Sequence, residues 1–151
     1  MVSHEEKKRL AREWYELLGS ARYEEAKAYC SDDFVFYPMI TRKLEGVEPF
    51  LELEGANMDP CPGFTFEIIN LICEGDWVAV HFIFDGTIPE DVSEYLGATV
   101  TKRHQYHDVM TWIRFNEEGK ICEKRAKYNE LFILKQLGVP EILEFEKKRG
   151  R

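Results

Sequence analysis

The sequence predicts an α+β fold in which helices pack against one face of a curved antiparallel sheet. Helical periodicity marks both ends of the chain and a short stretch after Gly46. Four long segments rich in β-branched and aromatic residues lie between these helices and are separated by turns. The chain therefore begins with helices, continues with strands and closes with a helix, and it contains no internal repeat. This order is typical of an α+β domain.

The amino-terminal helices are predicted from a cap and a periodic apolar stripe. Ser3 and Glu6 form a capping box for a first helix of about 15 residues, and its stripe places Trp14 on the buried side. A second helix is expected over residues 21–30. The two helices are therefore expected to pack as an αα-hairpin.

The next segment is broken by turns and prolines. A turn at residues 31–33 is expected to precede a short strand over residues 34–37, which Pro38 ends. A third helix is expected from Gly46, and residues 57–63 are expected to form a rim or lid loop. Three acidic residues of that helix are expected to face water: Glu48, Glu52 and Glu54.

Two long strands are predicted over residues 64–72 and 77–87, and both are apolar on both faces. A sheet built from such strands needs a cover on each side. Helices cover one side, and a second copy of the chain is expected to cover the other, which predicts a homodimer.

A β-hairpin over residues 100–128 carries most of the polar side chains of chemical interest, and a helix capped by Asn129 closes it. Because side chains alternate across a strand, His107 and His104 lie on opposite faces unless a bulge intervenes. The second strand turns inward either one charged residue, Lys124, with Ala126 and Tyr128, or three charged residues: Glu123, Arg125 and Lys127. Burying one charge costs less than burying three, which favours the first register.

Composition excludes several classes of function. The formal net charge is −8, from 20 basic and 28 acidic residues, so nucleic acid and anionic membranes are not expected partners. Four scattered cysteines have neither metal-ligand spacing nor a disulfide framework. The amino terminus is charged and the apolar runs are short, which predicts a cytoplasmic protein without a membrane span. We expect one domain over residues 1–140 and a charged tail, prone to fraying, over residues 141–151.

Four stretches in this order resemble the nuclear-transport-factor-like superfamily, and most closely its SnoaL-like polyketide cyclases and steroid Δ5-isomerases. They are SDDFVFYP, VAVHF followed by Asp85-Gly86-Thr87, WIRFNEEGKI and NELFILKQLGV. The resemblance implies a cone in which helices and the concave sheet enclose a mostly apolar pocket for a small hydrophobic molecule.

The chain departs from these relatives at the positions that carry their chemistry. The isomerases' general base falls at Tyr37, their acidic oxyanion partner at Thr111 and their tyrosine donor at Trp14. The isomerase mechanism therefore does not carry over. The cyclases pair a histidine on the first hairpin strand with an aspartate that precedes the closing helix. In this chain His107 or His104 could supply the histidine, and the position of the aspartate is occupied by Asn129.

A third group of relatives, the scytalone-dehydratase-like enzymes, uses tyrosines and two histidines. On that resemblance we expect a cofactor-free and metal-free enzyme (cyclase, dehydratase or isomerase) with His107 and His81 as proton-transfer groups and Tyr37 as oxyanion donor. Five further residues are expected to bind the substrate: Trp14, Phe66, Lys124, Tyr128 and Asp108. The alternative is a non-catalytic ligand-binding or dimerisation domain, which an interior filled with aromatic side chains would favour.

Overall fold

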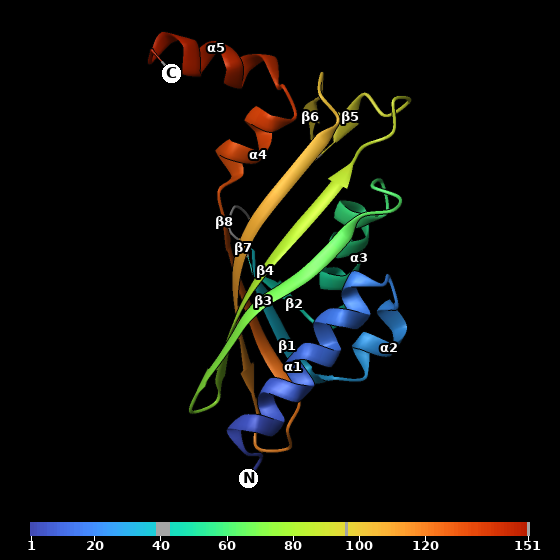
Figure 1. The fold of residues 1–151 in the computed structure, drawn as a ribbon. Helices are drawn as coiled ribbons and strands as arrows, with labels where there is room; N and C mark the ends of the chain where they lie inside the picture. The colour runs from blue at the N-terminus through green and yellow to red at the C-terminus, as the bar shows by residue number, and fades with distance from the viewer. Residues whose placement is uncertain (39–42, 96, 151) are drawn as a thin grey trace.

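The computed structural model describes residues 1–38, 43–95 and 97–150. A six-stranded sheet in the order β2-β1-β8-β7-β4-β3 curves around three helices, and two further helices lie at the end opposite the amino terminus (Figure 1). The strands are β1 (Cys30–Tyr37), β2 (Leu44–Glu45), β3 (Thr65–Glu74), β4 (Trp77–Thr87), β7 (His104–Phe115) and β8 (Ile121–Tyr128). A small second sheet pairs β5 (Glu94–Tyr95) with β6 (Ala98–Thr99).

The helices are α1 (His4–Gly19), α2 (Tyr23–Lys27), α3 (Val47–Met58), α4 (Glu130–Gln136) and α5 (Pro140–Lys148). The first three cover what we call the inner face of the sheet, and the opposite face is the outer face (Figure 1). This arrangement confirms the predicted α+β class and the curved sheet with helices over one face. No helix within the described residues is long and apolar enough to cross a membrane.

The cap of the first helix follows the prediction. The Ser3 hydroxyl oxygen accepts a hydrogen bond from the Glu6 backbone N–H at 3.2 Å. Trp14 is fully buried, and Ala11 and Leu18 are buried on the same stripe. Burial of this stripe against the sheet is the main source of stability for such an amphipathic helix.

Two predicted boundaries are wrong. The second helix ends at Lys27, and β1 begins at Cys30, so the turn expected at residues 31–33 is part of a strand. The cause is a parallel pairing with β8, which brings Cys30 opposite Ile121 and is followed by an irregular register. Such long-range pairing overrides the local turn signal of three small polar residues.

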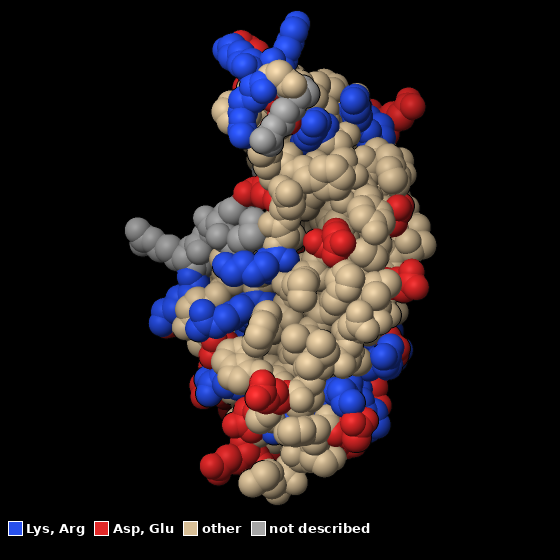
Figure 2. Space-filling view, turned by 60° about the vertical axis from the view of Figure 1, so that its left-hand side comes forward, with Lys and Arg blue, Asp and Glu red and all other residues tan. Residues whose placement is uncertain are grey.

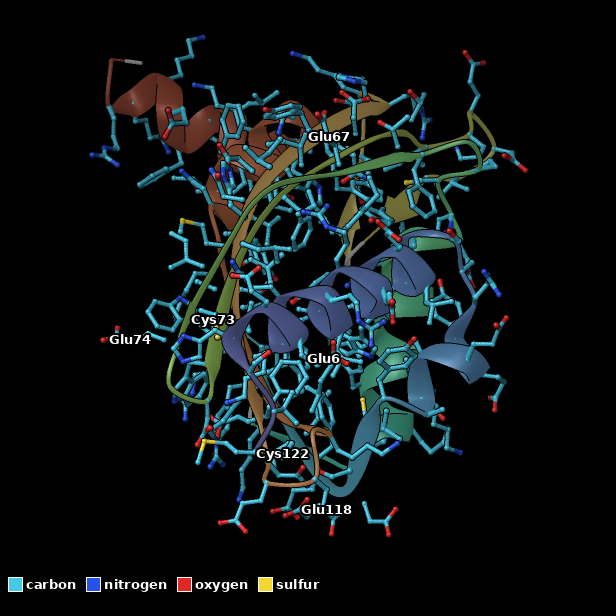
Figure 3. All side chains as sticks on the ribbon, turned by 60° about the horizontal axis from the view of Figure 1, so that its bottom comes forward. Glu6, Glu67, Cys73, Glu74, Glu118 and Cys122 are labelled. Atoms are coloured by element: carbon cyan, nitrogen blue, oxygen red, sulfur yellow. The ribbon has the colours of Figure 1, made fainter. Side chains whose placement is uncertain are left out.

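The third helix is longer than expected and turns one glutamate inward. It runs to Met58, into the segment predicted as loop. Phe50, Leu51 and Met58 are buried, and Glu54 lies between them on the same helical stripe, three and four residues from its neighbours. Glu54 therefore faces the interior. By contrast, Glu74 and Glu118 extend away from the body (Figure 3).

The hairpin residues divide between the two faces as strand alternation requires. His107 pairs with Phe84, and Thr111 pairs with Val80, on the inner face. On β8 the buried residues Lys124 and Ala126 face inward, which confirms the favoured register. The alternation of side chains along β8 thus turns Lys124 inward, and not the three charged residues of the other register.

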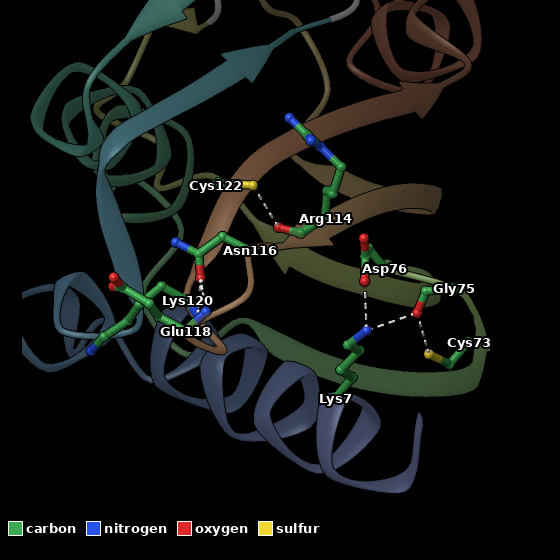
Figure 4. Close-up of polar contacts among 9 residues, drawn as sticks. All are labelled: Lys7, Cys73, Gly75, Asp76, Arg114, Asn116, Glu118, Lys120 and Cys122. Carbon is green, nitrogen blue, oxygen red and sulfur yellow. Dashed lines mark hydrogen bonds and ion pairs between the residues drawn. The ribbon is translucent and has the colours of Figure 1, made fainter. Parts of the chain in front are cut away.

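Polar contacts join α1 to the turns at the closed end of the sheet (Figure 4). The Lys7 Nζ donates to the Gly75 carbonyl and to Asp76 Oδ1, both at 2.8 Å. In the neighbouring hairpin turn, Asn116 Oδ1 accepts from the backbone N–H groups of Glu118 and Lys120, at 3.0 and 2.9 Å. The Lys7 contacts hold α1 against the turn between β3 and β4, and the Asn116 contacts stabilise the turn between β7 and β8.

Replacing Lys7 with methionine is expected to lower the free energy of unfolding by about 1–3 kcal/mol, because its charge-assisted bond to the Gly75 carbonyl is lost. The Asp76 carboxylate is mostly in water, and its contact adds little. Urea denaturation measures the loss. Lys8→Met is the matched control, since within the described residues Lys8 forms an ion pair with exposed Glu5 alone; equal effects of the two substitutions would contradict this role for Lys7.

The carboxyl-terminal residues are more ordered than expected. Residues 140–148 form α5, which projects from the body beyond α4 (Figure 1). Its buried Glu146 meets Lys135 of α4 at 3.3 Å. The charged tail is therefore helical to Lys148. The division into a domain over residues 1–140 and a tail remains a prediction.

Candidate active site

His107 lies on the inner face of β7, against the ring of Phe84, with 5.1 Å between the ring centroids. Burial lowers the pKa of His107 to about 4, because the charged imidazolium loses hydration among apolar neighbours. The side chain is half-buried. At neutral pH it is therefore an uncharged and partly exposed imidazole.

A chain of hydrogen bonds fixes the orientation of that imidazole. His107 Nε2 lies 2.6 Å from Gln105 Oε1, and Gln105 Nε2 donates to Cys61 Sγ at 3.0 Å. A carbonyl oxygen only accepts, so Nε2 carries the hydrogen and Nδ1 carries the lone pair. Gln105 and Cys61 are fully buried, which holds the arrangement in place. Nδ1 is the atom that can accept a proton.

Apolar side chains surround this histidine. A buried cluster joins the end of α3, the rim loop, β4 and α4, and Phe64 packs on Phe84 within it at 5.1 Å. Its buried members are Met58, Cys61, Phe84, Ile88, Tyr95, Val100, Ile133 and Leu137. The predicted rim loop thus contributes Cys61 to the site.

A second polar group lies deeper, among the aromatic side chains of the main core. Lys124 Nζ is 3.1 Å from Glu54 Oε1. Nearby, the Tyr15 hydroxyl shares a hydrogen bond with Thr111 Oγ1. Burial raises the pKa of Tyr15, so its hydroxyl stays protonated.

Two of the three predicted catalytic residues lie on the other face. His81 faces outward on β4 and meets Asp108 Oδ1 at 2.7 Å. Tyr37 faces outward on β1, where the Arg125 guanidinium lies 4.1 Å from its ring centroid. Strand alternation is the reason: Phe82 and Phe36, their sequence neighbours, point into the core. The expected convergence of Tyr37 and His81 on His107 is therefore wrong, as is the inward position of Asp108.

The remaining predicted residues lie inside. Trp14 is fully buried, stacks on Phe50 and donates from Nε1 to the Ala26 carbonyl at 3.1 Å. Phe66 packs against Tyr15 at 6.1 Å between centroids, and Tyr128 is half-buried opposite Val109. Side chains fill much of the space between α1 and the sheet (Figure 3).

Sequence reasoning missed Tyr15, Glu54 and Gln105. Tyr15 follows Trp14 in the first helix and hydrogen-bonds to Thr111, the position at which the isomerases' acidic oxyanion partner falls. The four-residue spacing from Phe50 to Glu54 was a usable signal for an inward carboxylate. Gln105 lies two residues before His107, and hence on the same face, which the alternation rule could have shown.

The family profile of SnoaL-like polyketide cyclases matches residues 8–137. The chain belongs to this family. That membership supports an enzyme that works without a cofactor and confirms the resemblance drawn from the sequence. Comparison with curated proteins finds no match.

Solved structures share the fold at low sequence identity. AclR from Streptomyces galilaeus, proposed to be a hydroxylase, has a TM-score of 0.75 and 21% identity over 90% of this chain and 98% of its own. A protein from Jannaschia sp. CCS1, classed by resemblance as a SnoaL-like polyketide cyclase, has a TM-score of 0.73 and 16% identity over 88% and 94%. A ketosteroid-isomerase-like protein from Catenulispora acidiphila, in complex with trimethylamine, has a TM-score of 0.69 and 15% identity over 87% and 93%.

Proposed function

We propose that this SnoaL-like protein is a cofactor-independent acid–base enzyme that cyclises, dehydrates or isomerises a small hydrophobic, oxygenated molecule, such as a polyketide or terpenoid. One observation carries the proposal: a neutral imidazole with a fixed tautomer, His107, lies half-buried among apolar side chains. A site of this kind, apolar with a few placed polar groups, suits a small organic substrate. A cytoplasmic location remains a prediction.

The chemistry would begin at His107 Nδ1. This atom takes a proton from a carbon next to a carbonyl group, or from a hydroxyl group, of the bound molecule. The positive charge that develops on the ring is stabilised through Nε2–H, which donates to Gln105 Oε1 at 2.6 Å. In an isomerisation the imidazolium returns the proton to another carbon of the conjugated enolate, and in a dehydration it gives the proton to the leaving oxygen. In a cyclisation the enolate carbon attacks a second carbonyl carbon of the same molecule, and the imidazolium protonates the alkoxide oxygen that forms. No redox partner is needed for any of these reactions.

Incubation with a panel of polyketide-derived and terpenoid ketones, followed by mass spectrometry and NMR of the products, tests the proposal. We expect loss of water, or rearrangement without a change of mass, for at least one compound. Ligand binding without conversion across the panel would replace the proposal with the alternative of a non-catalytic binding domain. The aromatic filling around Trp14, Phe34 and Phe50, all fully buried, is the observation that favours this alternative.

We further propose that the outer face of the sheet pairs with a second copy of the chain. Exposed apolar residues gather there on β3 and β7: Ile72, Tyr106, Met110 and Trp112. Figure 2 shows a broad, largely uncharged surface with a few acidic side chains in it and with lysine and arginine near its margins. Its acids Asp108 and Asp85 each lie within hydrogen-bonding distance of a histidine, His81 or His104, at 2.7 and 2.9 Å, so each carboxylate has a partner on its own face.

Trp112→Glu is expected to convert a dimer into a monomer at micromolar concentration, because it places an unpaired carboxylate at the centre of the apolar face. Sedimentation equilibrium measures the change in mass. Leu143→Glu, an exposed site on α5, is the matched control and is expected to leave the dimer intact. A wild-type protein that is monomeric at these concentrations would refute the pairing.

A further inference from the structure

Lys124 is a charged residue buried in the main core. Its side chain is 3% exposed, and Glu54, at 13%, is its only ion-pair partner within the described residues. Four rings surround the ammonium at 4.5–5.6 Å from Nζ to the ring centroids: Trp14, Tyr15, Phe36 and Phe50. The ammonium thus lies in an aromatic box with one carboxylate.

This arrangement is costly for the fold alone. A buried ion pair loses hydration, and an apolar pair of similar volume often serves a core equally well or better. The ammonium has three N–H groups, and among the described residues only Glu54 offers an oxygen acceptor. The other two N–H groups face ring surfaces, which attract a cation but accept no strong hydrogen bond. The ammonium therefore retains capacity for an oxygen atom.

Tyr128 links the surroundings of the pair to the site of His107, because it packs against the main core, which holds the rings around Lys124, and against the cluster that includes Phe84. Burial raises the pKa of Tyr95 and Tyr128, and the negative charge of Glu54 raises both further. Glu54 thus lies within electrostatic range of both hydroxyls. Tyr95 belongs to the apolar cluster that includes Phe84, on which His107 packs. Tyr128 thus places the imidazole and the charged pair in adjoining parts of the interior.

We propose that Lys124 is the oxyanion-binding group of this interior and that Glu54 is its resident counter-ion, displaced when the enolate or phenolate oxygen of a ligand binds. The inference rests on the proposed function only in placing the ligand in the same interior. It assigns the stabilisation of negative charge to Lys124 and leaves proton transfer to His107. The two roles belong to different residues and are separable by substitution.

The probe is 2-naphthol, a planar phenol whose absorption and fluorescence distinguish the neutral from the ionised form. At pH 7 the free phenol is protonated, because phenols ionise near pH 10. We expect wild-type protein to bind it as naphtholate. Lys124→Met is expected to reduce the ionised fraction of bound naphthol by about 10- to 1000-fold, the effect of one opposite charge at contact distance. Lys124→Arg restores a cation and is expected to recover ionisation in part.

Glu54→Gln separates this role from a structural one. With the resident anion removed, naphtholate is expected to bind about tenfold more tightly, whereas a purely structural pair would lose binding with either substitution. Near-ultraviolet circular dichroism checks that each variant is folded. Ionisation that persists in Lys124→Met but disappears in His107→Ala would assign the role to His107 and overturn the proposal. Naphthol that does not bind, or binds only in its neutral form, would also overturn it.

Naphthol binding requires no turnover, so this test and that of the proposed function fail independently. Ionised naphthol on a protein that converts no ketone would uphold the role of Lys124 and reject the enzyme. The opposite result is a protein that binds naphthol in its neutral form and converts a ketone equally fast with and without the Lys124→Met substitution. That result would uphold the enzyme and reject the role of Lys124.

Discussion

Replacement of His107 by alanine is expected to lower kcat/KM by about 10²- to 10⁴-fold for any compound that the protein converts, the range that follows from removing a positioned proton-transfer group. The physical reason is that Nδ1 of His107 is the proton acceptor held ready on the inner face, with its tautomer fixed by Gln105. Steady-state kinetics of the wild-type and variant proteins measure the effect.

His104→Ala is the matched control for this substitution. His104 lies on the same strand, three residues earlier, and its side chain is exposed on the outer face beside Asp85. It is expected to retain wild-type kcat/KM. His107→Ala with undiminished turnover, or equal losses in both variants, would show that the chemistry does not depend on the inner-face imidazole.

The second large effect is a dependence of stability on pH. Folding lowers the pKa of His107 from 6.5 to about 4, so between these values the unfolded chain binds a proton that the folded chain does not. The stabilisation is fully present above pH 6.5 and is lost as the pH falls towards 4. It amounts to about 3 kcal/mol in the free energy of unfolding.

Urea denaturation at pH 7 and pH 4 of the wild type and His107→Gln isolates this contribution, because the other titrating groups are common to both proteins. The wild type is expected to lose about 3 kcal/mol more than the variant on acidification. Parallel losses in the two proteins would mean that His107 is hydrated and titrates as in a free peptide.

The sequence alone was sufficient to predict those features that depend on residues close to one another in the chain. The Ser3 cap, the buried Trp14 stripe and the Asn129 cap all follow from side chains within four residues, and the structure confirms each. The inward position of Lys124 followed from comparing the cost of burying one charge with that of three. These predictions needed no knowledge of distant contacts.

Long-range contacts decided the rest. Residues 31–33 were predicted to form a turn, but β1 pairs with β8 on both sides of them, at Cys30 and from Val35, and they form an irregular part of that strand. Tyr37 and His81 were placed inside by resemblance, although each alternates with a core phenylalanine and so points outward. Glu54 was predicted to face water because the local sequence does not reveal its partner, Lys124, which lies 70 residues away in the chain. A carboxylate that pairs across such a distance leaves little local trace.

The most direct test of the account is an NMR pH titration of the four histidine rings, with and without compounds of the ketone panel. We predict that the ring protons of His107 titrate near pH 4 and shift when a compound binds, while those of His81 and His104 stay unperturbed by it. A His107 ring that titrates near pH 6.5 and ignores every compound would contradict the assignment of the active site.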